Sequence, residues 1–218
     1  MPAMNRRAVA ACCVVFMSTS AGAIQVTLDR RAIEEAIFVG QSRIEADRTR
    51  FHVPYRVSVA LPPVDWIDVI TPFHRVELAA EMNARSGGRQ FSQREALQIL
   101  SDAPNQIDLL VELTFHPLNA FVAVPSYQVV IVGPGGTRVQ PRRLDRFPRF
   151  AARIEPSGPG FPMPNATAVF GGGQPVLGGT LIAAFDGSSL NPNGRYDAVV
   201  VEGETELARS VLDFAKMR

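Results

Sequence analysis

Residues 107 to 115 spell Ile-Asp-Leu-Leu-Val-Glu-Leu-Thr-Phe. Every second residue in it is apolar: Ile107, Leu109, Val111, Leu113 and Phe115. Successive side chains of a β-strand point to opposite faces, so this period of two predicts a strand with one buried face. Such a face must be covered by another apolar layer, so the stretch predicts a packed, sheet-based core.

A second alternating segment runs from Phe51 to Leu61. Pro54 has no N–H to donate, so we expect an edge strand or a bulge there, and Pro62-Pro63 predicts the end of the strand. From the alternation in these two segments, and in a third from Tyr127 to Ile131, we expect the following side chains to be buried: Tyr55, Val57, Val59, Leu109, Val111, Leu113 and Val129.

The remaining sequence adds shorter strand-like segments and three helix signals. The expected strands are 65–70, 127–131, 137–139, 181–185, 198–201 and 207–214, the last of which also fits a helix. Residues 156–165, with four prolines and two glycines, predict a loop. The helix starts are Asp29, for a helix to about Gly40, then Thr71-Pro72, and the capping box Ser92 to Glu95. Together these signals predict an α+β fold: a β-rich, sandwich-like antiparallel sheet core with about three short helices, mostly in the first half.

The first 23 residues have the layout of a secretory signal peptide. Arg6 and Arg7 precede an apolar run from Ala8 to Met17, and Ala21-Gly22-Ala23 fits an A-x-A cleavage site. We expect residues 1–23 to be removed and residues 24–218 to form a single globular domain, exported to the periplasm or the extracellular space. The alternative is lipidation at Cys12, because Val9-Ala10-Ala11-Cys12 loosely resembles a bacterial lipobox.

The composition argues against several kinds of bond and partner: disulfides, thiolate-bound metals, nucleic acid and a membrane-spanning helix. Cys12 and Cys13 both lie in the predicted signal peptide, so the expected mature chain has neither disulfides nor thiolate ligands. Without Arg6 and Arg7 it carries 20 basic and 21 acidic residues, which argues against general binding to nucleic acid. No segment after residue 23 is long and apolar enough to predict a transmembrane helix.

Three histidines are the candidate metal ligands: His52, His74 and His116. Neutral imidazole binds zinc and copper well, and His52 and His116 share the non-apolar face of their predicted strands. Without close His-x-His spacing, however, the main expectation is no metal and no cofactor. Two histidines would then lie on the surface, and His74 would be a neutral residue in the first turn of its helix.

Residues 138 to 153 contain six arginines and one acidic residue, Asp145. Arginine forks bind phosphates and carboxylates and stack on flat rings, so these residues are the candidate anion-binding site: Arg138, Arg142, Arg143, Arg146, Arg149 and Arg153. The alternative is that they pair with acidic residues elsewhere in the fold.

Two functional hypotheses follow from these patterns. The first is an exported, non-catalytic binding or scaffolding domain of the cell envelope, whose partner is an anionic envelope component or another protein. The alternative is an exported hydrolase with acid/base groups from Asp65, Asp68, Glu112 or the histidines. Nucleophile-elbow, phosphate-loop and dinucleotide motifs are absent from the sequence.

The first testable prediction concerns processing. We expect cleavage after Ala23, because the charged and then apolar start ends there in small residues. The intact mass of the exported protein should be that of a chain beginning at Ile24. A mature protein that begins at Cys12 and carries added lipid mass would contradict this prediction and support the lipobox.

Overall fold

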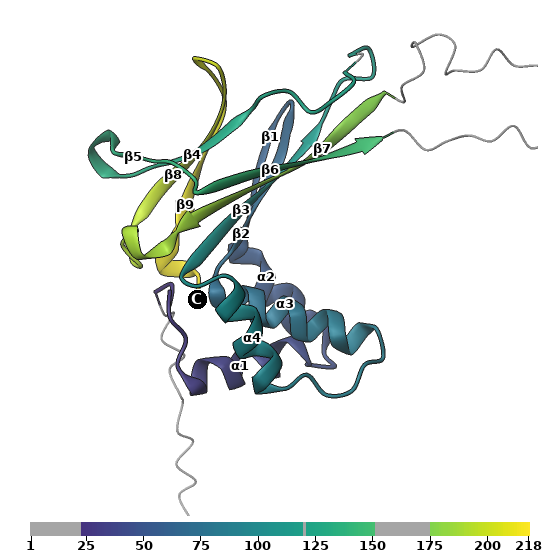
Figure 1. Ribbon diagram of the computed structural model, residues 1–218, viewed down its shortest axis with the longest axis vertical. Helices are drawn as coiled ribbons and strands as arrows, with labels where there is room; N and C mark the ends of the chain where they lie inside the picture. The colour runs from purple at the N-terminus through teal and green to yellow at the C-terminus, as the bar shows by residue number, and fades with distance from the viewer. Residues whose placement is uncertain (1–22, 120, 151–174) are drawn as a thin grey trace, which may run out of the picture.

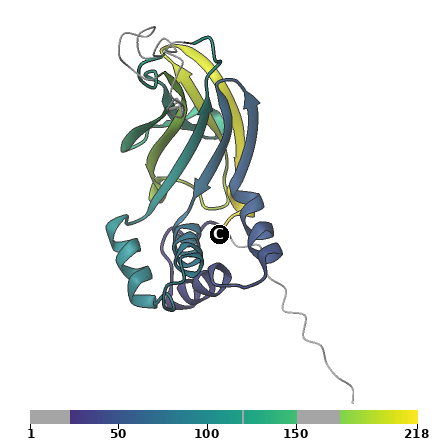
Figure 2. The same cartoon turned by 90° about the vertical axis from the view of Figure 1, so that its right-hand side faces the viewer.

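Two antiparallel sheets face each other, and four helices gather at one end of them (Figures 1 and 2). The computed structural model describes residues 23–119, 121–150 and 175–218. The predicted α+β class with a sandwich-like core is confirmed. The predicted signal peptide up to residue 22, the two cysteines, the 156–165 loop and Arg153 lie outside the described residues. Within the described part, no helix is long and apolar enough to span a membrane.

The larger sheet has five strands in the order β1-β2-β3-β7-β6, and the smaller has four in the order β5-β4-β8-β9. The first sheet consists of β1 Arg56–Leu61, β2 Val64–Ile70, β3 Gln106–Thr114, β7 Val176–Asp186 and β6 Arg143–Phe150. The second consists of β5 Arg138–Val139, β4 Gln128–Val132, β8 Arg195–Glu202 and β9 Thr205–Asp213. The segment that also fitted a helix is therefore a strand, followed by a 3-10 turn at Phe214–Lys216.

Strand β3 is the centre of the larger sheet. It pairs antiparallel with β2 on one side and β7 on the other, and Val111 lies between Ile67 and Leu181. All three side chains are fully buried in the core between the two sheets. The residues predicted to be buried are buried at Tyr55, Leu109, Val111, Leu113 and Val129, whereas Val57 and Val59 are half-buried because β1 is an edge strand.

The helices are α1 Arg30–Gly40, α2 Glu45–His52, α3 Pro72–Arg85 and α4 Gln93–Asp102. Three of them start where the sequence predicts. Asp29 accepts a hydrogen bond from the Ala32 N–H, Thr71 caps α3 through the His74 N–H, and Ser92 forms a capping box with Glu95. These caps satisfy backbone N–H groups that the first turn of a helix leaves without intrahelical partners.

The strand predicted from Phe51 is wrong for its first five residues. Phe51 and His52 end helix α2, residues Val53–Tyr55 form a 3-10 turn, and β1 begins only at Arg56. Helix α2 fully buries none of its residues, so its sequence has no amphipathic pattern that predicts a helix. It also has no side-chain cap at its start. Its acidic first turn and basic last turn do suit the helix dipole.

The helices form a second, smaller core of their own. Helix α1 crosses α3 closely at Gly40, where an added Cβ would lie 2.3 Å from the Glu77 carbonyl oxygen. The buried side chains of this core include Ile33, Ile37, Phe73 and Phe91. The absence of a side chain at Gly40 thus allows α1 to cover the middle of α3.

Arg218 joins the helical layer to the sheets. Its guanidinium pairs with Glu35 of α1 (2.8 Å from Nη2 to Oε2) and lies 4.7 Å from the centre of the Phe73 ring. Its backbone N–H donates to the Tyr55 hydroxyl at 2.9 Å, and its carbonyl accepts from Thr71. Figures 1 and 2 show this end of the chain between the strands and the helices. The contact fixes Tyr55 and the start of α3.

The second prediction tests the core register. In Val111→Asp, a carboxylate without a partner would be placed between the sheets, at a cost of several kcal/mol, comparable with the total stability of a typical domain. We expect the variant to be unfolded or strongly destabilised in a urea titration. The matched control is Leu110→Asp, one residue away and half-buried on the opposite face, which should fold. Normal stability of Val111→Asp would contradict the register.

Candidate metal centre

Two imidazoles and two carboxylates meet where α2 ends against α3. His74, Glu77 and Glu81 are spaced three and four residues apart on α3, so they lie on one face of that helix. His52, the last residue of α2, faces them. Three of the four side chains are buried, and His52 is partly exposed.

The orientation and protonation of His74 are set by the backbone. Its Nδ1 lies 2.9 Å from the carbonyl oxygen of Val69, the penultimate residue of β2. A carbonyl only accepts, so Nδ1 carries the proton and Nε2 of the neutral ring presents a lone pair. Burial lowers the pKa of His74 to about 4, so the ring is neutral at physiological pH. Tyr55 stacks on the ring, with centroids 4.1 Å apart.

His52 is held from both sides. Its Nδ1 lies 3.0 Å from Nε2 of His74, and its Nε2 lies 3.1 Å from Oε2 of Glu81. Because Nε2 of His74 is an acceptor, Nδ1 of His52 is the donor in that contact. Glu81 in turn accepts from Arg48 at 2.9 Å and from Arg85 at 2.7 Å. Burial raises the pKa of Glu81, but its hydrogen bond with His52 and the nearby cations outweigh it, so the pKa is lowered overall.

Glu77 is the anomaly of the cluster. Its side chain is fully buried, and neither carboxyl oxygen has a hydrogen-bond partner among the described residues. Burial, reinforced by the charge of Glu81, raises the pKa of Glu77 to about 8. A buried polar group without a partner costs about 1–3 kcal/mol, so most buried polar groups are hydrogen-bonded. The nearest ring nitrogen, Nε2 of His52, lies 3.6 Å from Oε1, beyond hydrogen-bond distance. The Glu77 carboxyl therefore lacks a hydrogen bond that its buried position calls for.

Three residues of the cluster are close enough together to hold a metal ion. One atom each from His52, His74 and Glu77 lie within 4.8 Å of one another. The Nε2 atom of His74 is 3.0 Å from Nδ1 of His52 and 4.0 Å from Oε2 of Glu77. Zinc bonds of about 2.0–2.2 Å in a tetrahedron require ligand atoms about 3.3 Å apart, between these two values. Both imidazoles also have an outer partner, Val69 for one and Glu81 for the other, as metal-bound histidines usually do.

A pocket opens beside the two imidazoles. Its volume is about 440 Å³, within the range of small-molecule sites. The walls come from α2, the turn after it, β1, β2, β3 and α3, and they consist of Thr49, His52, Val53, Arg56, Asp68, Ile70, His74, Leu78 and Leu110. Arg56 and Asp68 form a two-bond ion pair on the wall, with both contacts at 2.7 Å.

His52 and His74 are candidate metal ligands from the sequence alone, but the sequence does not predict their arrangement. The structure brings His52 to His74, because His52 ends a helix and does not lie on a strand. It places His116 elsewhere, exposed after β3, where its Nδ1 accepts from the Leu118 N–H at 3.2 Å. Sequence reasoning missed Glu77 and Glu81. The signal that points to them is the spacing from His74 to Glu77 and Glu81 along one face of a helix.

Of the three candidate acid/base carboxylates, Asp68 lines the pocket beside the imidazoles, whereas Asp65 and Glu112 do not. Asp68 pairs with Arg56, and Asp65 accepts from Thr114 at 2.6 Å. Glu112 accepts from Thr180 at 2.8 Å and pairs with Arg149. Each therefore already has a partner of the kind that surface strands commonly supply.

The arginine-rich segment is divided between the two sheets. Arg138 lies on β5 of the smaller sheet, whereas Arg143, Arg146 and Arg149 lie on β6 of the larger one. Most have a partner in the fold: Arg142 pairs with Asp186, Arg143 with Asp145 at 2.8 Å, Arg149 with Glu112, and Arg146 donates to the Tyr127 carbonyl at 2.7 Å. These contacts fit the alternative of internal pairing, and anion binding by the segment stays a prediction.

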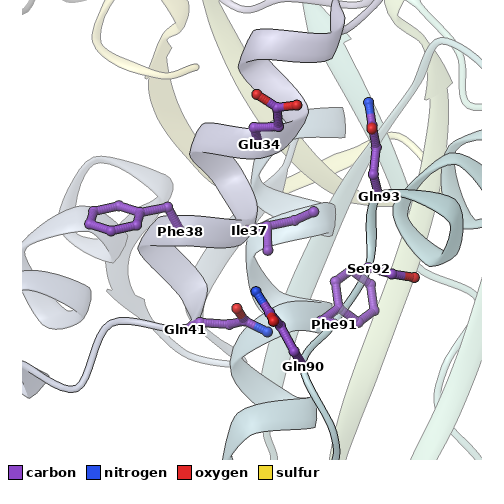
Figure 3. A pocket seen from close by; sticks show the side chains of 8 residues that line it. All are labelled: Glu34, Ile37, Phe38, Gln41, Gln90, Phe91, Ser92 and Gln93. Carbon is purple, nitrogen blue, oxygen red and sulfur yellow. The ribbon is translucent and has the colours of Figure 1, made fainter.

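A second pocket, of about 470 Å³, lies between α1 and the residues that lead into α4 (Figure 3). In Figure 3 the Phe38 side chain points away from Ile37 and Phe91, which belong to the helical core. The lining is mostly glutamine and apolar, and its one carboxylate, Glu34, pairs with Arg30. This pocket brings together no group of acid/base or metal-binding residues.

Comparisons of the chain with protein-family models, curated proteins and solved structures give no match. The chemistry of the cluster is therefore the basis for its interpretation.

The third prediction concerns the unpartnered carboxyl. The pKa of Glu77 is about 8 in the folded protein against 4.5 for its usual value, so folding favours the protonated form. This contribution to stability is complete below pH 4.5 and is lost as the pH rises toward 8, with a slope of up to about 1.4 kcal/mol per pH unit. We therefore compare the free energies of unfolding in urea, with a chelator present, at pH 5.5 and pH 7.5. Between these two pH values the stability of Glu77→Gln should rise by about 2 kcal/mol relative to that of the unsubstituted protein.

His74 shifts stability in the opposite direction, but it does so in both proteins, so the comparison isolates Glu77. The matched control is Glu204→Gln, at an exposed turn between β8 and β9. An equal pH dependence in Glu77→Gln and the unsubstituted protein would show that the carboxyl is not strained by burial.

Proposed function

We propose that this protein is an exported binding domain of the cell envelope whose ligand is a divalent transition-metal ion, held by His52, His74 and Glu77. The observation that carries the proposal is the buried Glu77 carboxyl, which lies beside two imidazole nitrogens and has no hydrogen-bond partner in the part of the chain that the structure describes. A cation between these groups supplies the missing partner. Export rests on the sequence pattern of residues 1–23.

The donor set favours zinc or a similar ion over calcium or magnesium. Imidazole nitrogens suit zinc, copper, iron and nickel, whereas calcium and magnesium prefer sites made only of oxygen. Nε2 of His74 already presents its lone pair, because Nδ1 donates to Val69. Nδ1 of His52 would exchange its proton for the metal, while Nε2–H continues to donate to Glu81.

The fourth prediction tests this site with zinc. Titration of Zn²⁺ into the purified protein, followed by calorimetry, should show one saturable site. At a free zinc concentration 100 times Kd, the free energy of unfolding should rise by about 2.7 kcal/mol. His52→Ala and Glu77→Gln should each weaken binding at least tenfold, because each removes a ligand.

The matched control is His116→Ala, which removes an exposed imidazole far from α3 in sequence and outside the cluster. It should bind zinc as the unsubstituted protein does. If the unsubstituted protein and all three variants bound zinc equally, the zinc site would lie elsewhere. If none showed saturable binding, the proposed function would be wrong.

A further inference from the structure

We infer that the metal centre is an open one, and that the pocket beside it binds a monocarboxylate with an apolar chain whose carboxylate completes the metal coordination. This inference rests on the proposed function. It adds the chemical class of the second ligand and the part of the molecule that recognises each end of it.

The number of protein ligands leaves a coordination position free. Structural zinc sites are closed by four protein ligands, whereas sites that receive another molecule have three. Here three residues converge, and Glu81 is engaged by Arg48, Arg85 and His52. Of the three ligands, His52 and His74 line the pocket, and Glu77 is not among its lining residues. The free position therefore faces the pocket.

The charge around that position favours an anion. With a divalent ion in place, Glu77 neutralises one of its two charges. The charge of Glu81 is exceeded by those of Arg48 and Arg85, which both contact it. On the pocket wall, Arg56 and Asp68 cancel each other. The occupied site thus keeps a positive excess in a partly enclosed place, where a carboxylate is attracted and an ammonium group is repelled.

The rest of the pocket suits an apolar chain. Val53, Ile70, Leu78 and Leu110 are the aliphatic side chains of its wall, and they come from four separate elements of the fold. Val53 is 66% exposed, so a hydrocarbon chain that covered it would remove apolar surface from water, which favours binding. A ligand with a charged head at the metal and an aliphatic tail along these residues satisfies both halves of the pocket.

The fifth prediction uses cobalt as a spectroscopic probe. The protein is loaded with Co²⁺, and its visible absorption is followed as acetate, butanoate or octanoate is added. We expect all three to shift the cobalt band, with Kd falling by up to about fourfold for each added methylene that the pocket buries. Octylammonium, with the same chain and the opposite charge, should leave the band unchanged.

Two leucine variants separate the pocket from the general surface. Leu110→Gln puts a polar group on the pocket wall and should weaken octanoate binding at least tenfold while leaving acetate binding unchanged. The matched control is Leu97→Gln, at a leucine of α4 that is 52% exposed and does not line the pocket, and it should bind both carboxylates normally.

Each failure has its own meaning. If Co²⁺ gives no protein-bound band, the metal centre itself is absent, and both proposals fall. If the band is present but no carboxylate shifts it, the centre is closed and only this inference is overturned. Equal affinity for acetate and octanoate, or equal effects of the two leucine substitutions, would also overturn the assignment of the pocket to an apolar chain.

Discussion

The short connection between β2 and α3 fixes how the helical layer meets the sheets. Thr71 directly follows β2 and caps α3 through the His74 N–H. One turn later, the His74 ring donates back to the Val69 carbonyl of the same strand. The Thr71 hydroxyl also donates to the Arg218 carbonyl, which brings the far end of the chain to the same place. A single junction thus sets the angle between the sheets and the helical layer.

This junction also positions the candidate site. Because α3 leaves the sheet at a fixed angle, its face with His74, Glu77 and Glu81 meets the last turn of α2. Tyr55, which follows α2 in a 3-10 turn, stacks on His74 and exchanges hydrogen bonds with the Arg218 backbone. The imidazoles are therefore held by side-chain packing as well as by hydrogen bonds, which is the preorganisation that a binding site needs.

The burial of Glu77 opposes stability in the metal-free protein. A leucine at that position would pack in the helical layer without the cost of an unpartnered carboxyl. The close crossing of α1 at Gly40 makes the position more enclosed still. Local conflicts of this kind between packing and chemistry are expected at functional sites. The conflict at Glu77 is the physical reason for assigning a function to this cluster instead of the arginine-rich segment, in which Arg142, Arg143 and Arg149 already pair with carboxylates.

The sequence by itself determined the elements whose signals are local. The alternation around Val111 predicted a strand, and the caps at Asp29, Thr71 and Ser92 predicted three helix starts, because these patterns depend on neighbouring residues alone.

The helical conformation of Phe51 and His52 was decided by the tertiary structure. The alternation there fitted a strand, and α2 buries no side chain that would have produced a helical pattern. The pairing of His52 with His74, 22 residues apart, likewise followed from the packing of α2 against α3. Helix α1 lies more than 35 residues earlier in the sequence, yet it packs closely on the Glu77 backbone carbonyl through Gly40. The candidate metal centre therefore arises from contacts between helices, which a single sequence does not encode as a pattern.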